Sequence, residues 1–250
     1  MSNPEVRIVK ANEKSEGDGA RVRRLFPVNR VGPVDPFVLM DEFFVDPPAS
    51  FPEHPHRGFE AVTYMLDGGF IHKDSSGNEA RVSEGGLQRI TMGKGIKHSE
   101  APVGEGTSHG IQLWVNLPKE LKDINPGYEV VSGSRLQVSS SKRIREKVLL
   151  NGSIGPKLKT EVRYREIKVE SGHFEWNPGR EFSGFLYVLN GSGVAEIKGE
   201  TKEISESFGV IEPAGEDHPV LVKTEDEISF IALSGRPHGE EIRLHGPFVD

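Results

Sequence analysis

The stretch His54-Pro55-His56-Arg57-Gly58-Phe59-Glu60 carries the strongest indication of fold and site in this chain. Residues i and i+2 of a β-strand point to the same face, so a strand here directs the imidazoles of His54 and His56 toward one point. Glu60 has the same parity and would join them if the strand continues unbroken past Gly58. The stretch therefore predicts a strand that contributes ligands to a metal site.

A second stretch, Gly95-Ile96-Lys97-His98-Ser99-Glu100, repeats the i, i+2 spacing. Two strands crossing a barrel interior would bring four donors together: His54, His56, His98 and Glu100. Three imidazoles and a carboxylate suit Fe, Mn, Ni, Cu or Zn. A single histidine in a strand is more often exposed or a hydrogen-bonded core residue. Two spaced pairs set among glycines favour the metal site, because burying these groups without a partner costs several kcal/mol.

The rest of the chain is predicted to be β-structure. It contains 29 glycines and 17 prolines, which interrupt short runs rich in β-branched and aromatic residues. This punctuation is typical of a sandwich or barrel. The best helix candidate is Lys119–Ile124, which is only a turn or two long. The predicted strands are Phe59–Leu66, Gly86–Met92, Gly110–Leu117, Phe185–Leu189, Val194–Ile197, Phe208–Ile211, Val220–Val222 and Ile228–Leu233.

An internal repeat predicts two domains. The string that begins at Tyr64 resembles the one that begins at Tyr187, and Gly-x-x-His recurs at His98 and His218. We place the domains at residues 1–131 and 132–250, with 118–159 as the connection and possible first strands of the second domain at 130–138 and 147–150. Aligning the repeats leaves His218 without partner histidines, because Asn177, Gly179 and Ser183 stand opposite His54, His56 and Glu60. The second domain is therefore expected to be structural.

Composition excludes several classes of function. The net charge of −7 argues against direct nucleic-acid binding, which needs clustered positive charge. The chain contains no cysteine, so thiolate ligands and thiol nucleophiles are excluded. No stretch approaches the roughly 20 apolar residues of a membrane span. Residues 1–19 lack the apolar core of a signal peptide, so a cytoplasmic location is expected.

Several strings resemble the pirin family of the cupin superfamily. They are Phe51–Glu60, Gly95–Pro102, Asp35–Phe43, His109–Leu117 and His245–Val249. The resemblance implies two tandem cupin barrels (double-stranded β-helix or jelly-roll) and one iron ion in the first barrel. It assigns ligand roles to His54, His56, His98 and Glu100. General cupins use the glutamate at the position of Glu60 instead, which leaves Glu60 as a neighbouring group or an alternative ligand.

The resemblance also implies two functions of different classes. One is quercetin 2,3-dioxygenase activity, in which a flavonol reacts with dioxygen and releases carbon monoxide. Glu100 would then be catalytic, carrying the proton of the flavonol hydroxyl, and Co would join Mn, Ni, Cu and Zn as alternatives to iron. The other is non-enzymatic: an iron redox sensor that binds a transcription factor or a metabolic enzyme. A cleft beside the metal able to admit an aromatic ligand would favour the enzyme.

Other residues receive supporting roles. Arg57 has the opposite parity to the histidines and should leave the barrel to pair with a surface acid. Gln112 is a candidate hydrogen-bond partner of a metal ligand. Trp114 is expected in the core or an interface, and His72 in solvent. The closing segment Leu244–Val249 is expected to pack back across the domain boundary.

Overall fold

The computed structural model describes residues 6–28, 31–215 and 218–250, and the chain divides into two compact units. The N-terminal unit comprises Asn12–Arg135, Gly155–Thr160 and His238–Asp250. The C-terminal unit comprises Leu136–Ile154, Glu161–Pro237 and the first strand up to Ala11. The sequence predicts two consecutive domains, at 1–131 and 132–250. The two compact units are not consecutive in the chain, because each end of the chain joins the unit formed mainly by the other half.

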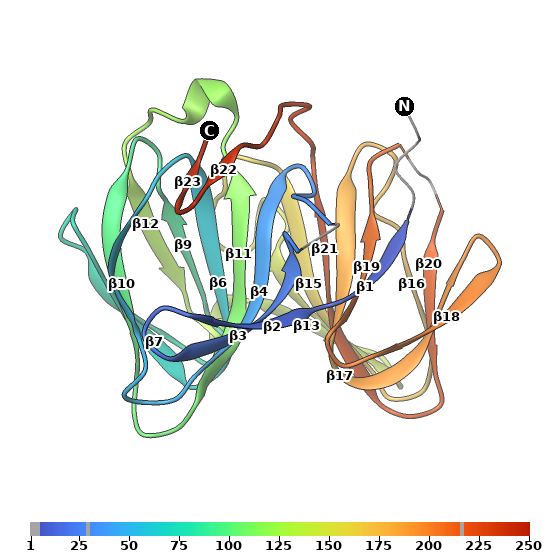
Figure 1. Ribbon diagram of the computed structural model, residues 1–250. Coiled ribbons are helices and arrows are strands. Elements are labelled where there is room, and N and C mark those ends of the chain that lie inside the picture. Colours follow the sequence, from blue (N-terminus) through green and yellow to red (C-terminus); the bar gives the residue numbers. More distant parts are fainter. Residues whose placement is uncertain (1–5, 29–30, 216–217) are drawn as a thin grey trace. The chain divides into compact units, whose positions relative to one another are not determined.

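The N-terminal unit contains a seven-stranded and a four-stranded antiparallel sheet within the described residues (Figure 1). The first has the order β12-β9-β6-β11-β4-β3-β2, the second β5-β10-β7-β8, and β22 pairs with β23. The elements are β2 Asn12–Glu16, β3 Ala20–Phe26, β4 Phe37–Val45, β5 Phe51–His56, β6 Phe59–Asp67, β7 Gly69–Asp74, β8 Glu79–Ser83, β9 Leu87–Thr91, β10 Ile96–Pro102, β11 Ser108–Asn116, β12 Gly127–Val131, β22 Leu244–His245, β23 Phe248–Val249, and the 3₁₀ turns η1 Lys119–Leu121 and η2 Gly133–Arg135.

The C-terminal unit has one sheet along the path β1-β19-β17-β21-β15-β14-β13, with β16, β18 and β20 attached beside β17. Its core includes Trp176, Leu186 and Phe230. The strands are β1 Arg7–Lys10, β13 Gln137–Ser140, β14 Ile144–Leu150, β15 Val162–Val169, β16 Gly172–Trp176, β17 Ser183–Ile197, β18 Glu200–Ser205, β19 Phe208–Glu212, β20 Val220–Thr224 and β21 Ile228–Gly235.

These elements confirm the predicted all-β class and correct some details. The two short strands expected at 185–189 and 194–197 form one bent strand, β17, whose bulge lies between Val188 and Asn190. Gly191 has φ +84°, which lets the chain bend there without ending the strand. The strand suggested over 130–138 is interrupted by η2, and β12 pairs with β9 of the N-terminal unit. No helix in the described part of the chain is long and apolar enough to cross a membrane.

Gly58 connects β5 to β6 and lies against the closing segment of the chain. Its φ is +87°, and a Cβ atom there would be 1.9 Å from the carbonyl oxygen of Val249. Val249 is completely buried and packs with Phe59 and Ile96. The closing segment therefore returns to the N-terminal unit, where a glycine leaves room for its backbone.

Replacing Gly58 with alanine should destabilise the protein through this close contact. Gly77→Ala is the matched control: Gly77 has φ +86°, and apart from its chain neighbours no described heavy atom lies within 4 Å of the point where a Cβ would stand. Both variants carry the strain of a positive φ. Only Gly58→Ala adds overpacking, which should lower the free energy of unfolding by about 1–3 kcal/mol more than Gly77→Ala does. Urea denaturation measures both values, and equal losses would contradict the role given to Gly58.

Candidate metal centre

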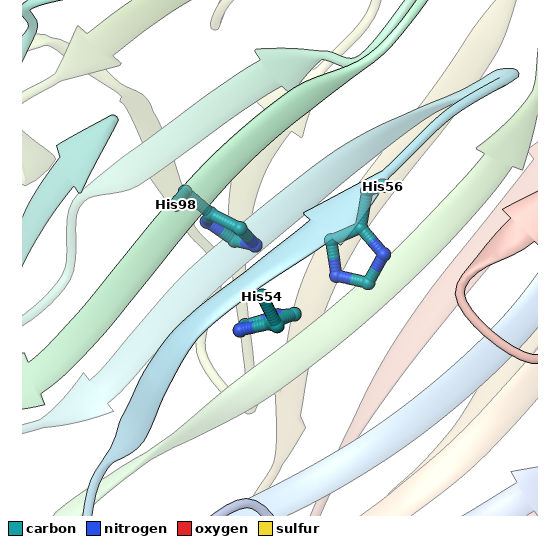
Figure 2. Close-up of side chains that lie close together, drawn as sticks. All are labelled: His54, His56 and His98. Carbon is teal, nitrogen blue, oxygen red and sulfur yellow. The ribbon is translucent and has the colours of Figure 1, made fainter. Parts of the chain in front are cut away.

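Strands β5 and β10 bring three predicted histidines together. The strands are antiparallel, with His98 opposite His54 and Ile96 opposite His56. The ring centroids lie 4.6 Å apart for His54 and His56, 4.5 Å for His54 and His98, and 5.1 Å for His56 and His98. Figure 2 shows the three imidazoles gathered beside the two strands. One ligand nitrogen from each lies within 4.8 Å of the others, a spacing that can hold one metal ion.

Backbone carbonyl groups fix the tautomers of two of these histidines. Nδ1 of His54 lies 2.7 Å from the carbonyl oxygen of Pro52, and Nδ1 of His56 lies 3.0 Å from that of Pro247. A carbonyl can only accept a hydrogen bond, so each Nδ1 is the donor and each Nε2 keeps a free lone pair. Hydrogen bonds of this kind orient the histidine ligands of metal sites. Pro247 thereby couples the closing segment to His56.

Of the three histidines, His98 has the surroundings most typical of a metal ligand. Its side chain is 1% exposed, and neither ring nitrogen has a hydrogen-bond partner among the described residues. A buried polar group without a partner costs about 1–3 kcal/mol, and coordination of an ion would remove part of this cost. The donor set of the three histidines therefore fits a transition metal.

Burial keeps His56 and His98 in the neutral form that binds metals. It lowers the pKa of His98 to about 2, and the nearby charges of His54, His56 and His72 act in the same direction. Burial also lowers the pKa of His56 to about 4; the hydrogen bond to Pro247 opposes this shift, and the charge of His54 adds to it. At neutral pH both rings are unprotonated and ready to coordinate an ion.

Glu100 lies beside this group of histidines. A bulge between His98 and Glu100 shifts the register of β10 on β5, and Glu100 stands opposite His72 of β7. One of its carboxylate oxygens lies within 4.8 Å of ligand nitrogens of His72 and His98. Burial raises the pKa of Glu100 to about 7, although a hydrogen bond from the side-chain amide of Gln88 opposes this shift. The four-residue ligand set thus remains a prediction.

His72 was expected in solvent, and this expectation is wrong. Its side chain is completely buried on β7, with Nε2 3.1 Å from Asp74 Oδ2. The ring stacks on Tyr128 at 4.5 Å. His72 lies two residues after Phe70, so the two side chains share a face of β7, and the apolar Phe70 could have indicated that His72 points inward. The sequence alone does not reveal that β7 pairs with β10 and places His72 opposite Glu100.

Glu60 points away from the centre. Counting residues along one strand predicts that Glu60 shares a face with His54. The turn at Gly58 instead moves the chain from the four-stranded to the seven-stranded sheet, so the alternation of side chains in β5 does not continue into β6. Its carboxylate accepts hydrogen bonds from Thr91 Oγ1 at 2.6 Å and from the backbone N–H of Lys159 at 2.7 Å. Within the described ranges it belongs to neither group of side chains that could hold a metal.

The structure meets some of the expectations for the other supporting residues and corrects others. Gln112 reaches Glu100 only through a chain of hydrogen bonds: Thr63 Oγ1 donates to Gln112, and Gln88 donates both to Thr63 and to Glu100. Arg57 forms the predicted surface ion pair, with Asp250 at 2.7 Å. Trp114 is not simply core, because it stacks on Phe59 and meets His56 edge-on at 4.9 Å beside a cleft.

That cleft has a volume of about 760 Å³ and is lined by the three histidines and Glu100. Aromatic side chains, among them Phe43 and Trp114, form part of its wall. Arg24 also lines it and pairs with both oxygens of Asp41, at 2.8 and 2.7 Å. Its size lies in the range of small-molecule sites, about 300–1,000 Å³. The cleft can therefore bring an aromatic molecule to a metal ion held by the histidines.

The C-terminal unit offers no comparable centre within the described residues, where both groups of potential ligands belong to the N-terminal unit. The residues that the repeat places opposite the metal ligands serve local structure. Asn177 Oδ1 accepts the backbone N–H of Gly179, and Ser183 Oγ accepts that of Ala214. His218 is exposed. The structural role of this unit remains a prediction.

Two tandem antiparallel β units, one of them with a histidine cluster at a cleft, define a two-domain cupin. The chain belongs to the pirin family. Residues 19–115 match the family described as Pirin, and residues 164–250 match the Pirin C-terminal cupin domain. A pirin-like protein of Solanum lycopersicum is 36% identical over 98% of this chain and 85% of its own length.

Solved structures support the same fold. A quercetin 2,3-dioxygenase from Acinetobacter baumannii superimposes with a TM-score of 0.85 at 26% identity, covering 97% of this chain and 90% of that one. The bacterial pirin YhhW of Escherichia coli, solved in complex with nickel(II), gives a TM-score of 0.74 at 21% identity, with 93% and 99% coverage. These likenesses confirm the predicted pair of cupin barrels.

Proposed function

We propose that this chain is a metal-dependent dioxygenase that opens a flavonol-like substrate, with quercetin 2,3-dioxygenation as the reaction type. The observation that carries the proposal is the cleft of about 760 Å³ that reaches the three histidines. Its aromatic wall suits a flat phenolic molecule better than a small hydrophilic acid. The 26% identical quercetin 2,3-dioxygenase of A. baumannii supports the same reaction class.

The proposed ligands are His54, His56, His98 and Glu100, with iron as the native metal and Mn, Ni, Cu, Co or Zn as ions that the same donors accept. The histidines supply neutral nitrogen donors. Glu100 would supply the one negative charge, and one of its oxygens lies within 4.8 Å of a ligand nitrogen of His98. The carbonyl groups of Pro52 and Pro247 bond to Nδ1 of His54 and His56, which would leave their Nε2 lone pairs free for the ion.

The protein would contribute orientation and proton transfer. When bound, the ion would polarise the flavonol oxygen and bring dioxygen beside it. Trp114 and Phe43 would hold the aromatic rings in the cleft. Glu100 would accept the proton of the flavonol hydroxyl, because a carboxyl group with a pKa of about 7 exchanges protons readily at neutral pH.

Incubation of the metal-loaded protein with quercetin tests the proposal. We expect oxygen-dependent loss of the flavonol absorbance together with release of carbon monoxide. The same incubation under argon, and with protein stripped by a chelator, should leave the absorbance unchanged. Failure with each of iron, manganese, nickel, copper and cobalt would refute the proposed reaction.

Metal affinity should depend on pH through Glu100. Its pKa in the folded, metal-free protein is raised to about 7, so below pH 7 a proton must leave before the carboxylate can coordinate an ion. The proton on Glu100 alone should lower the affinity by about tenfold per pH unit below pH 7, down to pH 5. His56 adds no proton above pH of about 4. Cobalt titrations by calorimetry would measure this slope, and a pH-independent affinity over this range would contradict Glu100 as a ligand.

A redox sensor is the second candidate, and one contact favours it. His56 bonds through Nδ1 to Pro247, and the neighbouring Arg57 pairs with Asp250, so a change at the metal can reach the surface along the closing segment. A protein partner would then read that segment. Hydrogen exchange of residues 244–250 should differ between the Fe(II) and Fe(III) forms. Equal exchange in both forms and in metal-free protein would exclude this route.

A further inference from the structure

His72 and Asp74 form a histidine–carboxylate pair that the proposed reaction does not use. Asp74 accepts hydrogen bonds from the backbone N–H groups of Ser76 and Asn78, at 2.9 and 3.1 Å, and from the side-chain amide of Asn78 at 2.8 Å. The Asp74 carboxylate can only accept hydrogen bonds. Nε2 of His72, which lies 3.1 Å from Asp74 Oδ2, is therefore the donor in this contact. Nδ1 of His72 therefore carries the free lone pair.

This lone pair has no hydrogen-bond partner in the part of the chain that the structure describes, although His72 is completely buried. The ring is held in place by Tyr128, which stacks on it at 4.5 Å with 12° between the planes. A carboxylate behind a histidine, with the other nitrogen left free, is the arrangement that commonly supports a metal-ligating histidine. His72 is thus built like a ligand.

The two ring nitrogens of His98 point to the same conclusion. Neither has a partner among the described residues, and an ion held with His54 and His56 would use only one of them. In the neutral ring only one nitrogen carries a lone pair, so His98, which is 1% exposed, can bind either an outer or an inner ion, one at a time. His72 and Glu100 each place a ligand atom within 4.8 Å of one on His98 and of each other. Three buried donors therefore converge a second time, with His98 in common.

We propose that His72, His98 and Glu100 form an inner binding position for a divalent transition-metal cation, which shares His98 and Glu100 with the outer position of His54, His56, His98 and Glu100 and binds the ion in its place. Both positions include Glu100, and the inner position has the greater negative charge because Asp74 would support His72 from behind. It is also the more buried, since His54 is half-buried at the cleft whereas His72 is not exposed at all. A cation would reach it from the cleft past the shared residues His98 and Glu100.

Cobalt binding to a His54→Ala/His56→Ala variant tests the inner position, because this variant lacks both histidines that belong to the outer position alone. After chelator treatment and reloading, it should retain one Co(II) per chain by elemental analysis, with a visible cobalt spectrum. Adding His72→Gln should remove both signals. Adding Asp74→Asn should weaken cobalt binding about 10–100-fold, the usual effect of losing the group behind a ligand.

His173→Gln, added to the same variant, is the matched control because His173 is exposed in the C-terminal unit. It should leave cobalt binding unchanged. Near-ultraviolet circular dichroism establishes that each variant is folded, and the single His54→Ala variant offers the same readout with less disturbance. Folded outer-site variants that bind no cobalt, or that bind it equally well with Gln at position 72, would overturn the inner position. The assay needs no flavonol turnover, so its failure and that of the proposed dioxygenase are distinguishable.

Discussion

His98→Leu should make the metal-free protein more stable and abolish its stabilisation by metal. Leucine fills a similar volume without the two buried nitrogens that lack partners among the described residues. Removing such groups should raise the free energy of unfolding by about 1–3 kcal/mol. Wild-type protein should gain about 2.7 kcal/mol when free metal is present at 100 times its dissociation constant. The variant should gain none of this, because His98 belongs to both groups of converging ligands.

Denaturant unfolding of both proteins, with a chelator and with cobalt, measures the two opposite responses. His173→Leu is the control, since it removes an exposed imidazole from the C-terminal unit and should change neither response. A metal-free His98→Leu protein that is less stable than wild type would mean that the His98 nitrogens find partners in solution. A variant that is still stabilised by cobalt would remove His98 from the metal centre.

Local rules predict that His54 and His56 share a face and that His98 lies on a strand, whereas the meeting of the three also needs the pairing of β5 with β10. Strand alternation puts His54 and His56 on one face, and the Gly-x-x-His string marks the strand that brings His98 beside them. The all-β class likewise follows from short apolar runs between glycines and prolines. These features are set by neighbouring residues and by the period of a strand, both of which are visible in sequence.

The parts that could not be predicted depend on pairing between distant segments. Glu60 leaves the centre because the chain changes sheets at Gly58, which interrupts the alternation. Glu100 lies with His72 because a bulge shifts its register after His98. The exchange of chain ends between units follows the same logic: β1 pairs with β19, and Val249 bonds to Arg57. Register and strand partners are tertiary properties that alternation does not specify.

Glu100→Gln should leave three histidines to hold a metal ion and lower flavonol turnover by about 10²–10⁴-fold, the usual contribution of a general acid or base. Glutamine has nearly the same shape and can still accept the hydrogen bond from Gln88 through its amide oxygen. It cannot take up a proton, so the change in rate near pH 7 that the wild-type carboxyl group produces should disappear. Steady-state rates between pH 5 and 9, at saturating metal and normalised to bound metal, would show both effects.

The matched control is Glu60→Gln, which alters an equally buried glutamate that is bonded to Thr91 and Lys159 and lies outside both ligand groups of the described residues. Its turnover per folded, metal-loaded molecule should equal that of wild type, because the turn at Gly58 directs Glu60 away from the histidines. If Glu60→Gln instead removed activity and Glu100→Gln preserved it, the proton acceptor would be the glutamate that general cupins use. The bulge in β10 would then have no catalytic consequence. Equal turnover in all three proteins would show that neither carboxylate carries the proton.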